Sequence, residues 1–227
     1  MAKETTPRKG RSGTLMYTVY HTLKEDICNG LIRSGDLLSE AQLATKLGVS
    51  RTPVREALAA LENEGLVEIR RGVGASVKPL SFSDILHIYE LRKVLEPLAA
   101  KTAVHHITRA EMDSYRKRFN DLFKFQDLSP LSQYIKYAEL DWSFHMLLAE
   151  RCENPYVLSM MNLIVPNIRR MQIFSYRPEN HALPETVNQH IQLIDVLLEG
   201  DPAKIKAALE NHLNWSLAGF VTSSVLL

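Results

Sequence analysis

Apolar side chains recur at helical spacing near the start of the chain. Leu15, Val19, Leu23 and Ile27 are four residues apart, which places them on one face of a helix. Gly30 follows them and is a residue type that commonly ends helices. The pattern predicts an amphipathic first helix that packs on a neighbouring element.

Two shorter helices are predicted next, joined by a tight turn. Ser39 begins the first, because its hydroxyl can cap the helix while Gln42 completes a capping box. Gly48 supplies the turn, and Ser50 caps a second helix that runs toward Gly65. Helices joined by so short a connection cross steeply, as in a helix-turn-helix motif.

The second of these helices has two chemically different faces. A buried stripe is predicted for its regularly spaced apolar residues, which are Val54, Ala57, Leu58 and Leu61. Arg51, Thr52 and Arg55 lie on the opposite face. Arginine pairs with guanine O6 and N7, and threonine contacts a thymine methyl or a phosphate, so this face suits a DNA recognition helix. A solvated face without a partner is the alternative.

A short hairpin follows the helices. Residues 66–70 and 75–78 have strand composition, and the turn between them contains Arg71 and Gly72. A hairpin tip can lie in a DNA groove, although most hairpins serve only the fold. Because this hairpin directly follows the two helices, we predict a winged helix-turn-helix, a DNA-binding unit, over residues 15–78.

Three stretches of this region resemble the GntR transcription regulators, namely LSEAQLA at residues 38–44, VSRTPVREAL at 49–58 and LENEGLV at 61–67. The resemblance implies that the exposed residues of the recognition helix contact the operator. It also implies that Arg71 and Gly72 sit at the wing tip in the minor groove. Ala41 departs from the pattern, since some members carry another DNA-contacting arginine there.

The composition changes on either side of this region. Residues 1–14 combine basic side chains with Pro, Gly, Ser and Thr, so they predict a disordered basic arm, or a remnant of cloning or of the start site. Pro79 marks the other boundary. Residues 79–227 show helical patterns and predict an all-α bundle. The expected fold class is therefore mainly α, with a small two-stranded β wing.

Capping and breaking residues divide the bundle into six predicted helices. Three of them span residues 81–106, 131–152 and 184–200. The other three begin at Thr108, at Pro155 with a kink at Pro166, and at Asp201. The sequence shows no strand pattern and no internal repeat in this half of the chain.

Charge is divided unevenly between the two predicted domains. Through residue 78 there are 12 lysines and arginines against 9 acidic residues, whereas the remainder has 15 against 17. Only the N-terminal part has the positive sign that DNA requires. The two distant cysteines indicate a reducing cytoplasm. The lack of a leader and of an apolar run of about twenty residues disfavours secretion and membrane insertion.

Four residues of the bundle form a candidate site for a divalent metal. Asp141 and His145 are four positions apart and project from the same face of one helix. His190 and His212 lie on the last two predicted helices. A carboxylate and three imidazoles that converge in a bundle suit zinc, nickel or manganese. The spacing leaves their convergence open, and helix histidines are more often satisfied by a carbonyl or by solvent.

The bundle is similar to the FCD effector domain of the FadR subfamily through ELR at residues 90–92, LEPLAA at 95–100, Asn154, and the aspartate and histidines above. The resemblance implies a metal held above a cavity and a small organic acid as effector. Candidate effector contacts are Arg92, which matches the family's helix-one arginine, then Arg169 and Arg170, and more weakly Asn162 and Asn188. One arginine of the adjacent pair is expected to face solvent. The histidines predicted to be structural or superficial are His87, His105, His106 and His181.

We therefore predict a cytoplasmic transcription regulator rather than an enzyme. It binds an inverted-repeat operator as a homodimer, and ligand binding to the bundle relieves repression or, as the alternative, activates transcription. Two alternatives use the same residues differently. A metal-dependent hydrolase would use the cluster to activate water but leaves the DNA-reading motif unexplained. A DNA-architectural protein without a sensor would bind DNA with little sequence preference and hold no metal.

Overall fold

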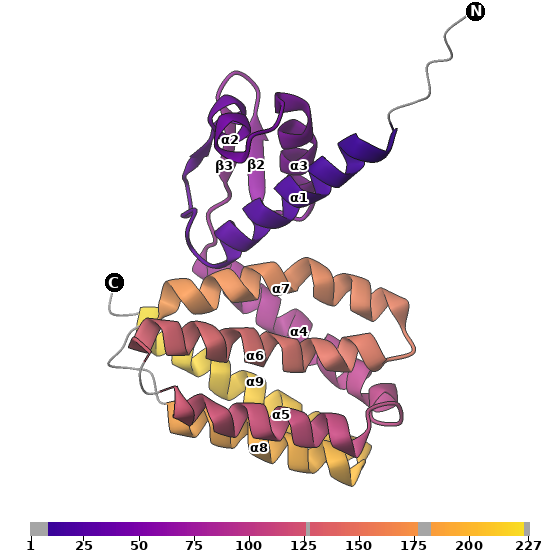
Figure 1. Ribbon diagram of the computed structural model, residues 1–227. Helices are drawn as coiled ribbons and strands as arrows, with labels where there is room; N and C mark the ends of the chain where they lie inside the picture. Colours follow the sequence, from indigo (N-terminus) through magenta and orange to yellow (C-terminus); the bar gives the residue numbers. More distant parts are fainter. Residues whose placement is uncertain (1–8, 126–127, 177–182, 225–227) are drawn as a thin grey trace, which may run out of the picture. The chain divides into compact units, whose positions relative to one another are not determined.

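The computed structural model describes residues 9–125, 128–176 and 183–224, and Figure 1 shows its elements along the chain. The chain divides into two compact units, residues 1–80 and 81–227. The first unit contains helices and a small sheet, and the described part of the second contains helices only. The predicted fold class, mainly α with a small β wing, is confirmed.

The N-terminal unit is a winged helix-turn-helix. Its elements are α1 (Lys9–Cys28), β1 (Leu37–Leu38), α2 (Glu40–Leu47), α3 (Arg51–Asn63), β2 (Val67–Arg70) and β3 (Gly74–Val77). Helices α1 and α3 pack against each other, and Val19, Leu23, Val54 and Leu61 are buried in their shared core. The spacing of apolar residues therefore identified the inner faces of both helices.

Helix α1 is longer than the sequence predicted. It begins at Lys9, so residues 9–14 are helical where an arm was expected, and residues 1–8 of that arm lie outside the described residues. Once packing fixes the apolar part of a helix, each further residue adds one hydrogen bond per residue ordered and needs no new nucleus, so a polar extension can follow. Leu15 is exposed and lies outside the core.

The chemistry predicted for α2 and for the start of α3 is found in part. The Ser39 side chain accepts a hydrogen bond from the Gln42 backbone N–H, but among the described residues no return bond from the Gln42 side chain completes the predicted capping box. Gly48 has a φ of 66°, which suits glycine. Ser50 is at the N-cap position of α3, but its side chain makes no capping hydrogen bond. Pro53 stands at the third helical position, where a capping serine commonly finds its donor, and proline has no N–H.

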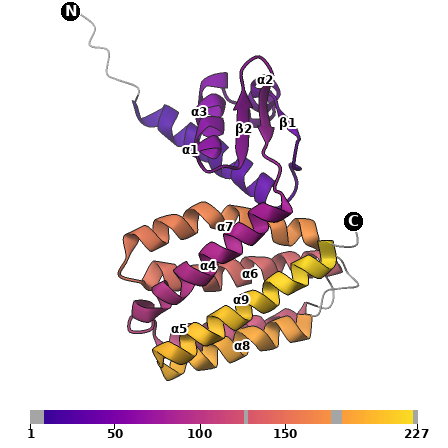
Figure 2. The ribbon, with the colours of Figure 1, turned by 180° about the vertical axis from the view of Figure 1, so that it is seen from behind.

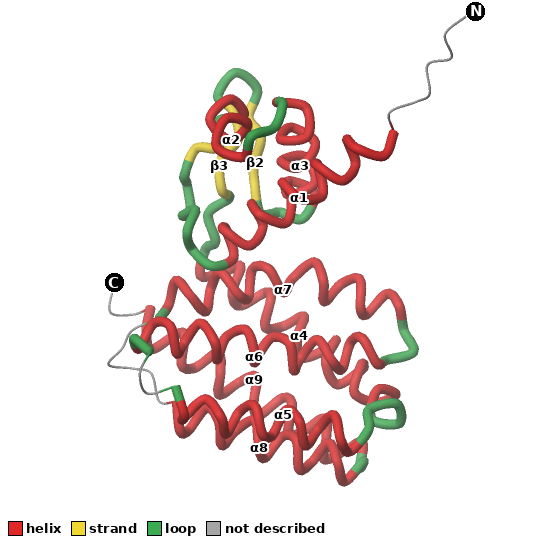
Figure 3. The backbone as a smooth tube through the Cα atoms, in the orientation of Figure 1, coloured by secondary structure: helices red, strands yellow, loops and turns green. Residues whose placement is uncertain are grey.

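The wing sheet contains a third strand that the sequence did not indicate. Figure 3 shows the strands of this unit in yellow. They are antiparallel in the order β1-β3-β2, and Leu38 and Ile69 both pair with Ala75. Strand β1 has two residues, which is too short for a periodic pattern to reveal it. It covers one edge of a hairpin that would be marginally stable as two strands alone.

The C-terminal unit is a bundle of helices, seen from both sides in Figures 1 and 2. Its elements are α4 (Phe82–Ala103), α5 (Arg109–Asp121), a short 3-10 helix η1 (Leu122–Lys124), α6 (Pro130–Arg151), α7 (Pro155–Ser175), α8 (Leu183–Glu199) and α9 (Pro202–Ser224). Helix α4 packs against α6, α7 and α9, while α5 packs against α8. This arrangement surrounds the interior of the unit with side chains from helices distant in sequence.

Capping residues in the sequence correctly predicted where two of these helices begin. Capping boxes of Ser81 with Asp84 and of Thr108 with Glu111 precede α4 and α5 as predicted. Helix α7 contains Pro166 within one continuous helical span.

Among the helices that the structure describes, none is both long and apolar enough to cross a bilayer.

Candidate metal centre and DNA-binding surface

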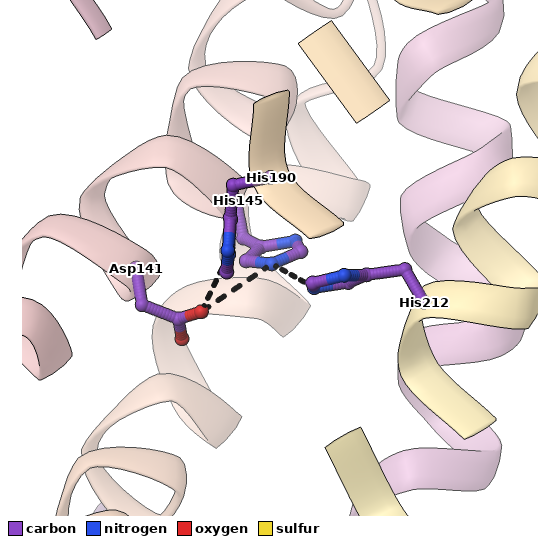
Figure 4. Close-up of side chains that lie close together, drawn as sticks. All are labelled: Asp141, His145, His190 and His212. Atoms are coloured by element: carbon purple, nitrogen blue, oxygen red, sulfur yellow. Dashed lines mark hydrogen bonds and ion pairs between the residues drawn. The ribbon is translucent and has the colours of Figure 1, made fainter. Parts of the chain in front are cut away.

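Four ionisable side chains meet in the interior of the helical unit, as Figure 4 shows. Asp141 and His145 lie one turn apart on α6, His190 lies on α8, and His212 lies on α9. Their potential ligand atoms are all within 4.8 Å of one another, and all four residues are buried. The structure thus brings together residues that sequence spacing alone left on three separate helices.

The Nε2 atoms of the three histidines lie around one centre. His190 Nε2 is 2.8 Å from Asp141 Oδ1, and His145 Nε2 is 3.9 Å from the same oxygen. His145 Nε2 and His212 Nε2 are 3.2 Å apart. The Nδ1 atom of His190 donates to the Thr186 carbonyl oxygen at 2.8 Å, so in a neutral ring the lone pair is on Nε2.

Further buried side chains hold the cluster in place. Tyr137 donates to Asp141 Oδ1 at 3.0 Å, and Gln172 donates to Oδ2 at 2.7 Å. His145 Nδ1 donates to Glu96 Oε2 of α4 at 2.6 Å. Metal-binding residues typically have such partners, which fix ring orientation and tautomer. The sequence interpretation missed them, although Tyr137 precedes Asp141 by one turn, a spacing that brings side chains together.

Burial and neighbouring charges determine the ionisation of the cluster. Burial raises the pKa of Asp141, but contact with His190 and the nearby charge of Arg92 hold it well below its ordinary value. Burial lowers the pKa of His212 well below its ordinary value, and the neighbouring histidines lower it further. Asp141 is thus a carboxylate and His212 a neutral imidazole, the forms in which these side chains bind metals.

The donor set fits a divalent transition metal. His190 Nε2, which lies 2.8 Å from Asp141 Oδ1, is buried without a hydrogen-bond partner among the described residues. Buried polar atoms in this condition are rare and often mark an ion or ligand. Three imidazoles and a carboxylate suit zinc, nickel and manganese, whereas calcium and magnesium prefer oxygen ligands.

Arg92, the first candidate for effector binding, lies beside the cluster. Its Nε donates to Glu96 Oε1 at 2.5 Å, and its guanidinium is 5.1 Å from the centre of the Tyr89 ring. Since Glu96 also contacts His145, the arginine and a candidate metal ligand share one carboxylate. The terminal nitrogens of Arg92 have no hydrogen-bond partner in the described part of the chain, so they can still donate to an anion.

The other candidate effector residues have different surroundings. Arg169 and Arg170 on α7 are both buried, so the expectation that one faces solvent is wrong. The side chains of adjacent helix residues point only about 100° apart. Where neighbouring elements cover a wide arc of the helix surface, both side chains are buried. The Arg169 guanidinium lies 5.1 Å from the centre of the Trp142 ring. Asn188 is exposed on α8, whose buried face carries His190, so the structure does not bring it to the cluster.

The described histidines outside the cluster lie at the surface. His87, His105 and His106 are exposed, and His106 Nε2 is 3.1 Å from Glu153. His181 lies outside the described residues. The exposed histidines provide controls for substitutions of the buried ones.

Helix α3 has an exposed polar face opposite its buried stripe. Arg51, Thr52 and Arg55 are exposed. Arg55 forms a two-pronged ion pair with Glu40 of α2, with hydrogen bonds of 3.0 Å from Nε and 2.8 Å from a terminal nitrogen. The pair orients Arg55 across the helix-turn-helix. Sequence spacing did not reveal it, because the two residues are on different helices.

The wing turn between β2 and β3 is exposed. Gly72 has a φ of 78°, a conformation that favours glycine. Val73 beside it is apolar and 69% exposed. Arg70 pairs with Glu68 at 2.9 Å, whereas Arg71 is exposed and has no ion pair among the described residues.

An exposed recognition helix followed by a wing defines the class of DNA-binding transcription regulators. The family model of the bacterial regulatory proteins of the gntR family matches residues 15–77, and that of the FCD domain matches residues 87–214. The chain belongs to the GntR family and contains an FCD domain. This order of domains matches a FadR-like architecture, as predicted.

Similar proteins are also named as regulators. The chain is 27% identical to the HTH-type transcriptional regulator YdhC of Bacillus subtilis over 86% of both chains. It is 28% identical to the HTH-type transcriptional repressor RspR of Escherichia coli over 86% of this chain and 84% of that one. The gluconate operon transcriptional repressor of Bacillus licheniformis is 32% identical over 68% of this chain and 62% of its own.

The fold also occurs in a solved structure. E. coli McbR/YncC has a TM-score of 0.77 at 21% identity, and the match covers 92% of this chain and 98% of that one. The family and these relatives establish a DNA-binding transcription regulator, not an enzyme.

Proposed function

We propose that the chain is a metabolite-responsive repressor that binds an inverted-repeat operator as a homodimer. In this proposal its helical unit holds a divalent metal and a small organic acid. The buried, convergent set of Asp141, His145, His190 and His212 carries the proposal. A packed core does not need four such groups, because burying them is costly unless they are paired or bind a ligand. The relative named as a gluconate operon repressor supports control by a metabolite.

The proposed DNA contacts come from the exposed residues of α3 and the wing. Arg51 and Arg55 read guanine edges in the major groove, and Thr52 contacts a thymine methyl or a phosphate. Arg71 and Gly72 approach the minor groove. A dimer places two α3 helices about one DNA turn apart, which requires an inverted repeat. Because the operator is in the cytoplasm of a bacterium, we place the protein there.

The exposed face of α4 is the surface that we assign to the homodimer. Leu91, Val94 and Leu98 repeat at intervals of three and four residues and are 49%, 66% and 47% exposed. Helix α7, which packs against α4, exposes Tyr156 and Met160. Apolar residues at this spacing form the seam between paired helices. A second copy of the chain supplies an identical seam in a two-fold assembly.

A charge in this seam tests the dimer. The Val94→Glu variant is expected to sediment as a monomer in analytical ultracentrifugation, because the new carboxylate cannot be buried without a partner. Its circular dichroism should be unchanged, since the side chain is exposed in the single chain. Glu90→Gln, an exposed position of the same helix, serves as the control. A Val94→Glu protein that remains dimeric would exclude this surface.

The proposed sensing site combines the cluster with the neighbouring arginines. A bound metal supplies a positive centre to which carboxylate oxygens bind. Arg92 donates its terminal nitrogens to the same acid, and Arg169 and Arg170 are buried candidates for its remaining charge. The acid must bind the DNA-released arrangement more tightly than the DNA-bound one, since only differential affinity shifts the population.

Elemental mass spectrometry of protein purified without chelators tests the metal site. We expect about one metal per wild-type chain, as in other sites built in bundle cores, and loss of metal in His190→Ala. The exposed His105→Ala variant should retain it. A metal-free wild type would contradict the site and favour a metal-independent pocket or a protein without a sensor. Equal loss in both variants would mean that the ligands are wrongly assigned.

A further inference from the structure

A buried chain of three side chains connects α4 to the metal cluster. Arg92 Nε donates to Glu96 Oε1 at 2.5 Å, and His145 Nδ1 donates to Glu96 Oε2 at 2.6 Å. None of the three residues is more than 2% exposed. Glu96 pairs with the Arg92 guanidinium through Oε1 and accepts from His145 through Oε2, so each carboxylate oxygen is directed to a different partner.

This carboxylate determines which nitrogen of His145 has the proton. A carboxylate only accepts hydrogen bonds, so Nδ1 must donate, and the neutral ring then has its lone pair on Nε2. Nε2 is the atom that lies 3.9 Å from Asp141 Oδ1 and 3.2 Å from His212 Nε2. Only this tautomer offers Nε2 to a metal held by the cluster.

We propose that Glu96 is a positioning residue of the metal centre, which fixes the tautomer and ring orientation of His145 while Arg92 compensates its buried charge. The inference rests on the proposed metal site. It adds to that site a residue of α4, a helix that supplies none of the four candidate ligands. The ion pair with Arg92 explains why one oxygen of Glu96 is placed in the interior. The other oxygen contacts His145, and only the positioning of that ring explains its place.

The Glu96→Gln substitution separates positioning from packing, because an amide has the same shape but one acceptor and one donor group. Arg92 can only donate, so the amide oxygen must face Arg92 and the amide nitrogen must face His145 Nδ1. His145 then accepts at Nδ1 and carries its proton on Nε2, where it cannot bind a metal. In the double variant Arg92→Met/Glu96→Gln the amide is free to turn, and the original tautomer returns.

Zinc is the probe for this test. Its dissociation constant is measured by competition with a chelating dye, and nitrogen NMR of the histidine rings reports the tautomer of the metal-free protein. We expect Glu96→Gln to weaken zinc binding about 10- to 100-fold and to move the His145 proton to Nε2. The double variant should recover most of this loss, which a merely structural role would not produce. Glu90→Gln, exposed on the same helix, should bind zinc as the wild type does.

The outcomes distinguish this inference from the metal site on which it rests. A wild type that binds no zinc would overturn the site itself. A wild type that binds zinc, with a Glu96→Gln variant of equal affinity and unchanged tautomer, would overturn only the role of Glu96.

A second pair of variants covers the case in which Glu96→Gln fails to fold because the charge of Arg92 is left unpaired. The comparison is then between Arg92→Met/Glu96→Gln and Arg92→Met/Glu96→Leu, which both lack charge. Only the first of these can accept a hydrogen bond from His145. Weaker zinc binding by the leucine variant supports the proposal, and equal binding overturns it.

Discussion

Replacing Tyr137 with phenylalanine removes one oxygen atom from the surroundings of the metal cluster. The hydroxyl donates to Asp141 Oδ1 at 3.0 Å, and both residues are buried. Burial raises the pKa of Tyr137 well above its ordinary value, and the charge of Asp141 raises it further, so the hydroxyl keeps its proton. The Tyr137→Phe variant preserves the ring but leaves a buried carboxylate with one donor fewer.

The loss of stability should exceed that of an ordinary tyrosine hydrogen bond. A hydrogen bond to a charged group contributes about 1.5–3 kcal/mol, against about 0.5–1.5 kcal/mol for a neutral one. Gln172 still donates to Asp141 at 2.7 Å, so we expect the lower part of the charged range, about 1.5–2 kcal/mol. Tyr89→Phe is the matched control, since Tyr89 is fully buried and its hydroxyl lies 2.8 Å from the neutral hydroxyl of Ser216.

Tryptophan fluorescence during urea unfolding measures this difference. The two tryptophans of the chain, Trp142 and Trp215, both lie in the C-terminal unit, so the signal reports on that unit. The measurement uses metal-free protein, because a bound metal would add its own stabilisation. If Tyr137→Phe destabilises the unit no more than Tyr89→Phe does, Asp141 is not the charged acceptor described above.

Two further predictions concern the DNA-binding unit. Arg55→Ala should weaken binding to an operator selected from random DNA by about 5- to 100-fold in gel-shift titrations, because the proposed bidentate contact with a guanine would be lost. Lys46→Ala, on the exposed side of α2, is the control, and an equal effect of both would refute a specific contact. Leu61→Ala should lower the free energy of unfolding of this unit by about 2–5 kcal/mol, measured by circular dichroism, because Leu61 is fully buried. Leu31→Ala, at an exposed position, should change it by less than about 0.5 kcal/mol, and comparable losses would contradict the assigned core.

Periodic patterns in the sequence were sufficient to predict an element wherever one continuous apolar face stabilises it. The stripe of α3, from Val54 to Leu61, was predicted because residues three and four apart share a helix face. Capping boxes marked the starts of α4 and α5 because their hydrogen bonds join residues three positions apart. Strand β1 escaped prediction because its stability comes from pairing with β3, about forty residues later, rather than from its own pattern.

The sequence by itself determined the residue types of the site and the helices that carry them. Asp141 and His145 are one turn apart on any helix, so their shared face follows from local geometry. Only the tertiary structure decided that His190 and His212 join them. It alone showed that Glu96 and Gln172 hold two of the candidate ligands, and that Glu40 orients Arg55.

These contacts join helices through side chains that are 15 to 67 residues apart in sequence, from Glu40 with Arg55 to His145 with His212. Helical periodicity relates residues only within a turn or two of one another. The way the helices pack against one another decides which of their inward faces meet, and that packing depends on the shape of the whole core.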